Sequence, residues 1–371
     1  MNVLIADWGR RPAGLYADFV TAINELGTHT AYVTYEMTSD VAHRMRDLEG
    51  RTLPVRTFKS RKGAVLGAPR LLVLIARLVS FLHKNEVSIV VVAMESIWLM
   101  PAIAVARAFS RFRLITIIHD AAPHPGEGSM LFGVMRRMTL RVSDDTIVLS
   151  RSVSDQLGPA QRRQKHHRPM HILRHPSYSF DTCIDSRDAP AGRTPVVGFF
   201  GRILDYKGLA LLLESVSHLA TAGGAVCLHV VGDGALDPYY ELIAATPNLV
   251  IDNRWVDPDE IEHIVSGFDV LALPYLEASQ SGVIGIAMGL GVPVVATPMA
   301  GLREQIQETQ CGVVSYETSP YSFAEAIRRL LDNDALYKAC SAAGLREARG
   351  RYSVVAVTQE LVQIFDSNVE R

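Results

Sequence analysis

The sequence predicts an α/β protein built from two doubly wound domains, each a parallel sheet covered by helices on both faces. Short runs rich in Val, Ile and Leu alternate with amphipathic segments through both halves of the chain. Strands that are apolar on both faces and separated by helices are typical of such sheets. The chain has 371 residues, enough for two domains of roughly 150 to 200 residues each.

The first domain is predicted over residues 1–175. It opens with the strand pattern NVLIAD and a helix at about 15–26, and TAYVTY, SIVVVA and RLITIIH follow as further strands. Proline, Ser, Asp and Gly then dominate residues 176–193, which we interpret as an interdomain linker.

The second domain is predicted over residues 194–350, where the strand patterns PVVGFFG, CLHVVGDG, VLALPY and PVVAT alternate with helical segments. A helical stretch is expected from about 322 to 348. The last residues, 351–371, are predicted to hold a helix that crosses back to the first domain.

Composition narrows the class of protein. Apolar residues make up 48% and charged residues 20%, which fits a folded globular chain. A formal net charge of −2 argues against a nucleic-acid partner. Four widely spaced cysteines and an opening without an export signal predict reduced thiols in a cytoplasmic protein. The apolar stretch at 71–82 is too short to span a membrane.

Open parallel sheets bind ligands at the carboxyl ends of their strands, so the chemistry is expected in the loops there. In the first domain, Gly14 closes a loop before a helix, where backbone N–H groups can approach an anion. A tight turn would need the same glycine. His119 ends the strand RLITIIH and can bind a sugar hydroxyl or act in acid/base chemistry, unless local backbone groups satisfy it.

In the second domain, GRILDYKG places Arg202 and Lys207 five residues apart around a loop, between Gly201 and Gly208. Two cations there suit a diphosphate whose charge grows as a sugar leaves, although both could be solvated loop cations. Gly232 ends the next strand, where nucleotide contact and close backbone packing are both open interpretations.

The segment PYLEASQSGV precedes a helix and is the most informative motif. Small residues at a helix N-terminus offer N–H donors to phosphate, and carboxylate and hydroxyl groups bind sugar or ribose hydroxyls. The candidate donor-binding residues here are Glu277, Ser279, Gln280, Ser281, Gly282 and Val283. We assign Glu277 to sugar recognition. Since no acidic pair stands at a strand end, no metal and no cofactor are predicted.

Basic residues cluster on the first half and predict peripheral contact with anionic lipid, although most such charges are solvated helix faces. They are Lys59, Arg61, Lys62, Arg70 and Arg77, then Arg136, Arg137 and Arg141, then Arg162, Arg163 and Lys165.

The two second-domain motifs together resemble the retaining GT-B glycosyltransferases of the glycosyltransferase 4 type, which build bacterial polysaccharides and glycolipids. The resemblance implies two Rossmann-like domains facing across a cleft, with the acceptor on the first and a UDP- or GDP-sugar on the second. It implies that Arg202 and Lys207 bind the donor diphosphate, that His119 lies near the donor sugar and that Gly14 lies near the diphosphate.

The same resemblance implies transfer of a hexose with retention, to a hydroxyl of a saccharide or lipid-linked acceptor. The family's E-x(7)-E signature is only partly present, because its two positions fall on Ala278 and Ile286, and Glu277 lies one position earlier. In many relatives the second glutamate holds the ribose. Two alternatives remain: a sugar-nucleotide epimerase of the same fold, and a catalytically degenerate nucleotide-binding subunit.

Overall fold

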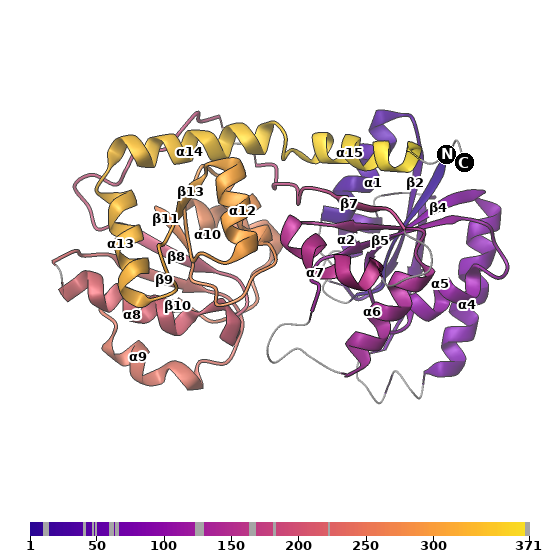
Figure 1. The fold of residues 1–371 in the computed structure, drawn as a ribbon, viewed down its shortest axis with the longest axis horizontal. Helices are drawn as coiled ribbons and strands as arrows, with labels where there is room; N and C mark the ends of the chain where they lie inside the picture. The colour runs from indigo at the N-terminus through magenta and orange to yellow at the C-terminus, as the bar shows by residue number, and fades with distance from the viewer. Residues whose placement is uncertain are drawn as a thin grey trace. The chain divides into compact units, whose positions relative to one another are not determined.

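A computed structural model describes residues 1–9, 15–39, 42–46, 48, 50–58, 63, 67–122, 130–162, 168–180, 183–221 and 223–367. The chain divides into two compact units (Figure 1). The first contains the strands β1 to β7 together with the last helix, and the second contains residues 175–353.

The first unit is built on a seven-stranded parallel sheet in the order β3-β2-β1-β4-β5-β6-β7. Its strands are β1 (Asn2–Asp7), β2 (Thr30–Glu36), β3 (Thr52–Val55), β4 (Val87–Met94), β5 (Arg113–Ile118), β6 (Asp145–Val148) and β7 (Met170–Ile172). Alternate residues of β1 enter two different cores, which is why these strands are apolar on both faces.

Helices cover both faces of this sheet. They are α1 (Leu15–Leu26), α2 (Ala42–Arg46), α4 (Ala68–Lys84), α5 (Leu99–Ala106), α6 (Met130–Val142), α7 (Arg151–Arg162) and α15 (Val354–Asp366). Val3 and Ile5 share a core with α1 and α15, whereas Leu4 and Ala6 share the opposite core with α4 and α5. The final helix α15 is thus an integral part of the first unit.

The second unit has a six-stranded parallel sheet in the order β10-β9-β8-β11-β12-β13. Its strands are β8 (Val196–Phe200), β9 (Cys227–Val231), β10 (Leu249–Asp252), β11 (Val270–Leu273), β12 (Val294–Ala296) and β13 (Gly312–Val314). Its α-helices are α8 (Leu209–Thr221), α9 (Tyr240–Ala245), α10 (Ile261–Ser266), α11 (Gly282–Gly289), α12 (Ala300–Thr309), α13 (Pro320–Leu331) and α14 (Asp334–Arg349). Three short 3₁₀ helices, η1 (Asp205–Lys207), η2 (Asp237–Tyr239) and η3 (Pro258–Glu260), join them.

Two parallel, doubly wound sheets confirm the predicted fold class. In each sheet the strand order reverses beside the first strand, between β1 and β4 and between β8 and β11. Ligands of open α/β sheets bind at such switch points, beyond the carboxyl ends of the strands. The residues that follow these four strands are therefore the first place to look for a site.

The stretch expected to be helical over 322–348 is helical, as two successive elements. The structure has two helices, and the side chain of Asn333 accepts a hydrogen bond from the Leu336 N–H at the start of the second. This cap gives the new helix its N-terminus. The segment expected as a linker has no helix or strand among its described residues, and the Ser177 N–H donates to Tyr352 O at 2.7 Å.

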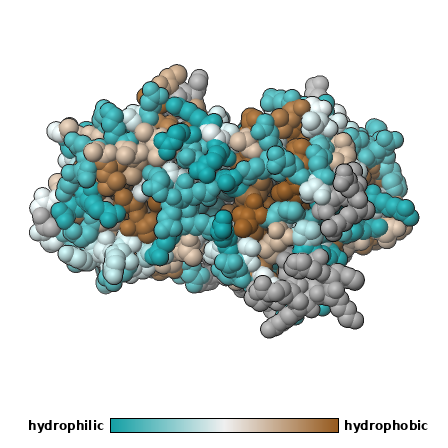
Figure 2. Space-filling model, turned by 45° about the horizontal axis from the view of Figure 1, so that its top comes forward, coloured by the Kyte–Doolittle hydropathy of each residue, from teal (hydrophilic) through white to brown (hydrophobic). Residues whose placement is uncertain are grey.

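On the face drawn in Figure 2, hydrophobic residues reach the surface in separate patches surrounded by hydrophilic ones. None of the helices in the described part of the chain is long and apolar enough to cross a membrane.

Candidate functional site

The basic loop of the second unit follows β8 and is folded against the loop that follows β11. The ammonium group of Lys207 donates to the hydroxyl of Tyr275 at 2.9 Å and lies 4.7 Å from the centre of that ring. The Leu276 N–H donates to Tyr206 O at 2.7 Å. The structure thus joins two of the predicted motifs, GRILDYKG and PYLEASQSGV, into one surface.

Gly208 makes this docking possible. Its φ is 71°, and a Cβ atom built there would lie 1.9 Å from Pro274 O. A side chain would therefore be strained by the backbone and would also force the two loops apart.

Gly232 is required by packing between neighbouring loops, and Gly201 by its backbone, whose φ is 121°. A Cβ on Gly232, which has φ 147°, would lie 2.0 Å from Gly201 O. A Cβ on Gly201 would lie 3.2 Å from Nζ of Lys207. Close backbone approach explains Gly232 without a ligand, while Gly201 leaves room for the ammonium group beside the end of β8.

The start of α11 is held by a side chain from α12. Oε1 of Gln305 accepts from the Ser281 N–H at 2.7 Å, and Nε2 of Gln305 donates to Ser281 O at 3.3 Å. The Ser281 hydroxyl lies 3.5 Å from the Tyr275 hydroxyl. The neighbouring Gln280 has a buried Oε1 without a hydrogen-bond partner among the described residues. This turn is fixed in place while a polar atom of Gln280 stays unsatisfied.

Glycines on one face of α11 bring it close to residues 175–180. A Cβ on Gly282 would lie 3.2 Å from the His175 ring, and one on Gly289 would lie 2.5 Å from Tyr178 O. Ile286 is 4% exposed and belongs to the apolar core of this face. The position where the family resemblance implies a ribose-binding glutamate is thus buried among hydrophobic side chains.

The remaining predicted residues of the second unit are more open. Arg202 and Glu277 are exposed, and Ser279 and Val283 are half-buried. A Cβ on Gly301 would lie 2.0 Å from Ser279 O, so the start of α12 packs directly against the backbone of this turn. Lys207 is fixed by its contacts, whereas Arg202 stands at the surface of the loop.

In the first unit, His119 follows β5 and is hydrogen-bonded to two groups. Its Nε2 lies 3.0 Å from Ala93 O and 2.8 Å from the hydroxyl of Tyr16, which itself donates to Ala93 O at 2.9 Å. A carbonyl oxygen only accepts, so the proton is assigned to Nε2, and Nδ1 is left as an acceptor. Burial lowers the pKa of His119, which keeps the ring neutral near pH 7.

A buried ion pair fixes the loop after His119. Arg136, 7% exposed, donates to Oε2 of Glu95 at 2.7 Å through Nη2 and also to the carbonyl of Asp120. Oε1 of Glu95 is buried without a partner among the described residues. Arg136 was expected in an exposed basic cluster. That expectation is wrong, because its guanidinium is buried and bonded to Glu95 and Asp120. Arg137 and Arg141 are exposed.

Asp7 ends β1 and is 1% exposed. Its Oδ1 accepts from the Gly9 N–H at 2.7 Å, and Oδ2 has no partner among the described residues. Burial raises its pKa to about 7, against an ordinary value of 3.8. Gly14, predicted to lie near the diphosphate, falls outside the described residues.

Sequence reasoning did not select five residues that the structure places at the strand ends of the first unit or at the joined loops of the second. They are Asp7, Tyr16, Glu95, Tyr275 and Gln305. Asp7, Glu95 and Tyr275 had a usable signal, because each closely follows a predicted strand. Tyr16 and Gln305 lie on helices, and no sequence pattern brings them to a strand end. Within the described ranges, no group of three or more His, Cys, Asp or Glu side chains is arranged to hold a metal ion.

Comparison with solved structures defines the class of fold. A HepE protein of Anabaena, solved with UDP-glucose, matches 99% of this chain and 100% of its own length with a TM-score of 0.74 and 18% identity. A protein of Listeria monocytogenes, assigned as a UDP-N-acetylglucosamine 2-epimerase, matches with a TM-score of 0.66 at 14% identity, over 100% of this chain and 96% of its own. The chain has the GT-B fold, two Rossmann-like units in one polypeptide.

Sequence comparison shows which protein family the second unit is similar to. Residues 194–333 match the family model described as Glycosyl transferases group 1. A 2-deoxystreptamine glucosyltransferase of Streptomyces kanamyceticus is 30% identical over 144 residues, which are 38% of this chain and 37% of that protein. The alignments span less than half the length of these curated relatives. The segment matched by the family model contains both the basic loop and the start of α11.

The buried carboxyl group of Asp7 makes the first unit less stable as the pH rises. Between about pH 4 and pH 7 the folded chain keeps a proton on Asp7 that the unfolded chain has released, so folding is favoured at the lower pH. Asp7→Asn should remove a fall in the free energy of unfolding of about 2.5 kcal/mol between pH 5 and pH 7.5. Urea unfolding at pH 5 and pH 7.5 measures it, followed by Trp8 and Trp98 fluorescence in a Trp255→Phe background.

The exposed Asp185→Asn variant serves as the control, because it removes a carboxylate without removing a buried one. Equal pH dependence in wild type and Asp7→Asn would contradict a proton held on this residue.

Proposed function

We propose that this chain is a retaining glycosyltransferase that moves a hexose-type sugar from a UDP- or GDP-sugar to a hydroxyl of a saccharide or lipid-linked acceptor. The observation that carries the proposal is the contact of Lys207 with Tyr275, which gathers a cationic loop and the N-terminus of α11 at one switch point. The match of residues 194–333 to glycosyl transferases group 1 supports it.

In this proposal the second unit binds the donor diphosphate. Lys207, held beside the Tyr275 ring, and the exposed Arg202 neutralise the phosphates, while the N–H groups of Gly282 and Val283 face them from the start of α11. The bond from the anomeric carbon to phosphate oxygen breaks, and the diphosphate leaves with both electrons. Arg202 and Lys207 stabilise that charge as it grows, and Glu277 binds sugar hydroxyls.

The first unit contributes the acceptor side. His119 is neutral and fixed through Nε2, so its Nδ1 can accept a hydrogen bond from a sugar hydroxyl. The acceptor oxygen attacks from the face that the phosphate leaves, and the departing phosphate takes the acceptor proton. Configuration at the anomeric carbon is thereby kept. The buried pair of Glu95 and Arg136 holds the loop of His119 in position.

Peripheral contact with anionic lipid would bring a lipid-linked acceptor within reach. On α4, Leu72 is 70% and Val73 is 59% exposed, and Arg77 and Lys84 are exposed on the same helix. Phe109 is 64% exposed, and its carbonyl lies 2.9 Å from Nε2 of His83 near the end of α4. Exposed apolar side chains among cations suit the headgroup region of a membrane.

Nucleotide binding is the first test. One of UDP, GDP or ADP, or its sugar, should raise the melting temperature of the wild-type protein, since binding to the folded state stabilises it. Replacing both cations, Arg202→Ala with Lys207→Ala, should lower the affinity for that nucleotide by at least about tenfold. The exposed Lys338→Ala, also in the second unit, should leave the shift unchanged. No shift with any nucleotide would count heavily against a transferase.

Transfer itself tests the role of His119. With an active donor and acceptor pair, His119→Gln should lower kcat by about 100-fold and leave nucleotide binding unchanged. Tyr16→Phe, which removes one hydrogen bond to the His119 ring, should lower kcat by a smaller factor. The anomeric proton of the product, followed by NMR, should show the configuration of the donor. A product of inverted configuration would refute the retaining mechanism.

Membrane contact is tested by flotation with vesicles of phosphatidylglycerol and phosphatidylcholine. The wild type should float with anionic vesicles and be released by salt. Leu72→Ser with Val73→Ser should reduce the bound fraction, because less apolar surface enters the bilayer. Tyr316→Ser in the second unit is the matched control, since Tyr316 is 94% exposed. Equal flotation of the α4 variant and the control would exclude docking through α4.

One observation favours the epimerase alternative. Asp7 and Glu95 place carboxyl groups beyond β1 and β4, and elimination chemistry needs such groups. Incubation of the bound nucleotide sugar without acceptor separates the two functions, because an epimerase changes the sugar and a transferase does not.

The buried Ile286 motivates the degenerate-subunit alternative. Nucleotide binding without transfer to any acceptor extract would favour it.

A further inference from the structure

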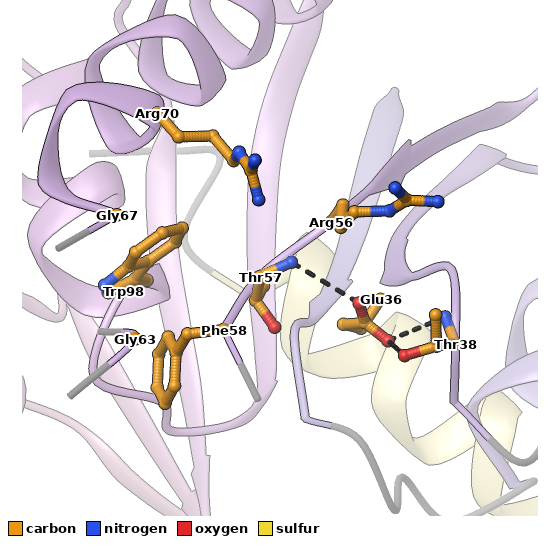
Figure 3. Close-up of a pocket in the computed structure, with 9 residues that line it drawn as sticks. All are labelled: Glu36, Thr38, Arg56, Thr57, Phe58, Gly63, Gly67, Arg70 and Trp98. Carbon is orange, nitrogen blue, oxygen red and sulfur yellow. Dashed lines mark hydrogen bonds between the residues drawn. The ribbon is translucent and has the colours of Figure 1, made fainter. Parts of the chain in front are cut away.

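The first unit contains a cavity of about 350 Å³ at the carboxyl ends of β2, β3 and β4 (Figure 3). Glu36 ends β2, Arg56, Thr57 and Phe58 follow β3, and Trp98 follows β4. Arg70, in the first turn of α4, extends toward the segment that carries Arg56 and Thr57 (Figure 3).

The cavity has an excess of positive charge. Arg56 and Arg70 line it, and the described residues give neither guanidinium a hydrogen bond or an ion pair. Among the described residues of its lining, Glu36 supplies the one carboxylate, which is 2% exposed and already hydrogen-bonded. Its Oε2 accepts from the Thr38 N–H at 2.7 Å and the Thr38 hydroxyl at 2.6 Å, and its Oε1 accepts from the Thr57 N–H at 3.3 Å. Two cations therefore line the cavity together with one carboxylate, which serves to join β2 and β3.

An aromatic wall lies beside the cations. The rings of Phe58 and Trp98 meet edge to face with their centres 5.2 Å apart. Trp98 is 4% exposed and fits against the start of α4, because a Cβ on Gly67 would lie 2.7 Å from its ring. Such a wall offers apolar contact to the C–H face of a sugar ring, while guanidinium groups form paired hydrogen bonds with phosphate or carboxylate.

The cavity lies on the same edge of the sheet as His119. In the strand order, β2 is separated from β5 by β1 and β4, so Glu36 and His119 are about 14 Å apart along the edge. Trp98, which follows β4, lies nearer to β5. A ligand that occupies the cavity can thus extend toward His119 without leaving this edge.

We propose that this cavity binds a phosphate ester carried by the acceptor, with Arg56 and Arg70 on the phosphate and Trp98 and Phe58 against the attached sugar. The proposal rests on the transferase function and names the class of its acceptor. At about 350 Å³ the cavity is at the small end of ligand pockets. That size suits one phosphorylated ring and is too small for a longer saccharide.

Binding to the full-length protein tests the proposal without any assay of transfer. Titration calorimetry with glucose 6-phosphate, glucose and glucuronate compares phosphate, no charge and carboxylate on one ring. Wild type should bind glucose 6-phosphate and not glucose. Arg56→Gln and Arg70→Gln should each lower the affinity for glucose 6-phosphate by about tenfold, as expected for loss of a charged hydrogen bond. Lys338→Gln, which removes an exposed cation of the second unit, should bind as wild type.

A second arm distinguishes a soluble from a lipid-borne phosphate. Vesicles of phosphatidylcholine with phosphatidylinositol present the same phosphate-and-ring chemistry at a membrane. Vesicle binding that Arg56→Gln weakens and Lys338→Gln does not, with no binding of glucose 6-phosphate, would support the cavity with a lipid source. Preference for glucuronate over glucose 6-phosphate, or equal behaviour of wild type and both arginine variants toward every probe, would overturn it.

The outcome is separable from that of the proposed function. UDP and GDP are titrated in parallel, because their proposed site lies in the second unit. Loss of nucleotide binding with intact glucose 6-phosphate binding would contradict the transferase and leave the phosphate cavity standing. Intact nucleotide binding with no phosphate binding would refute the cavity alone. Melting temperatures of the arginine variants equal to wild type exclude a folding defect.

Discussion

The contact between Gly208 and the carbonyl of Pro274 is the constraint on which the site of the second unit depends. It lets η1 close against the end of β11, which brings Lys207 to Tyr275 and Tyr206 to Leu276. A parallel sheet alone delivers these loops to the same edge, yet several ångströms apart. Backbone contact at one glycine converts two neighbouring loops into a single surface with a fixed cation.

Strand ends explain most of what could be predicted from the sequence. Apolar runs marked the strands of both sheets, and the rule that ligands bind beyond their carboxyl ends selected His119, Lys207 and the start of α11. The helical stretch over 322–348 was predicted, but its division at Asn333 was not located, because helix propensity is similar on both sides and one capping side chain decides it. Contacts of residues far apart in sequence could not be predicted: Gln305 reaches Ser281, and Arg136 reaches Glu95.

The substitution at Ile286 follows from the packing of α11. Glycines on that helix lie against residues 175–180, and its other side fills an apolar core, so the whole helix is buried except at its start. A charged side chain at Ile286 would need a partner there, because an unpaired buried charge costs several kcal/mol. In the proposed donor site, recognition of hydroxyl groups therefore falls to the turn before the helix, where Glu277 is exposed and Ser279 is half-buried.

Charged groups of the first unit fall into two sets with different physical roles. Asp7, Glu95 and Arg136 are buried, and their partners hold the ends of β1, β4 and β5 and the loop of His119. Such groups are positioned before any ligand arrives, so they add no ordering cost on binding. Arg56 and Arg70 are exposed and have no partner among the described residues, so their hydrogen-bonding capacity is left for a ligand. In the proposed transferase, reaction geometry near His119 and acceptor recognition near Arg56 would be separate properties of one sheet edge, and a change in acceptor could be accommodated at β2 and β3 without disturbing the groups around β5.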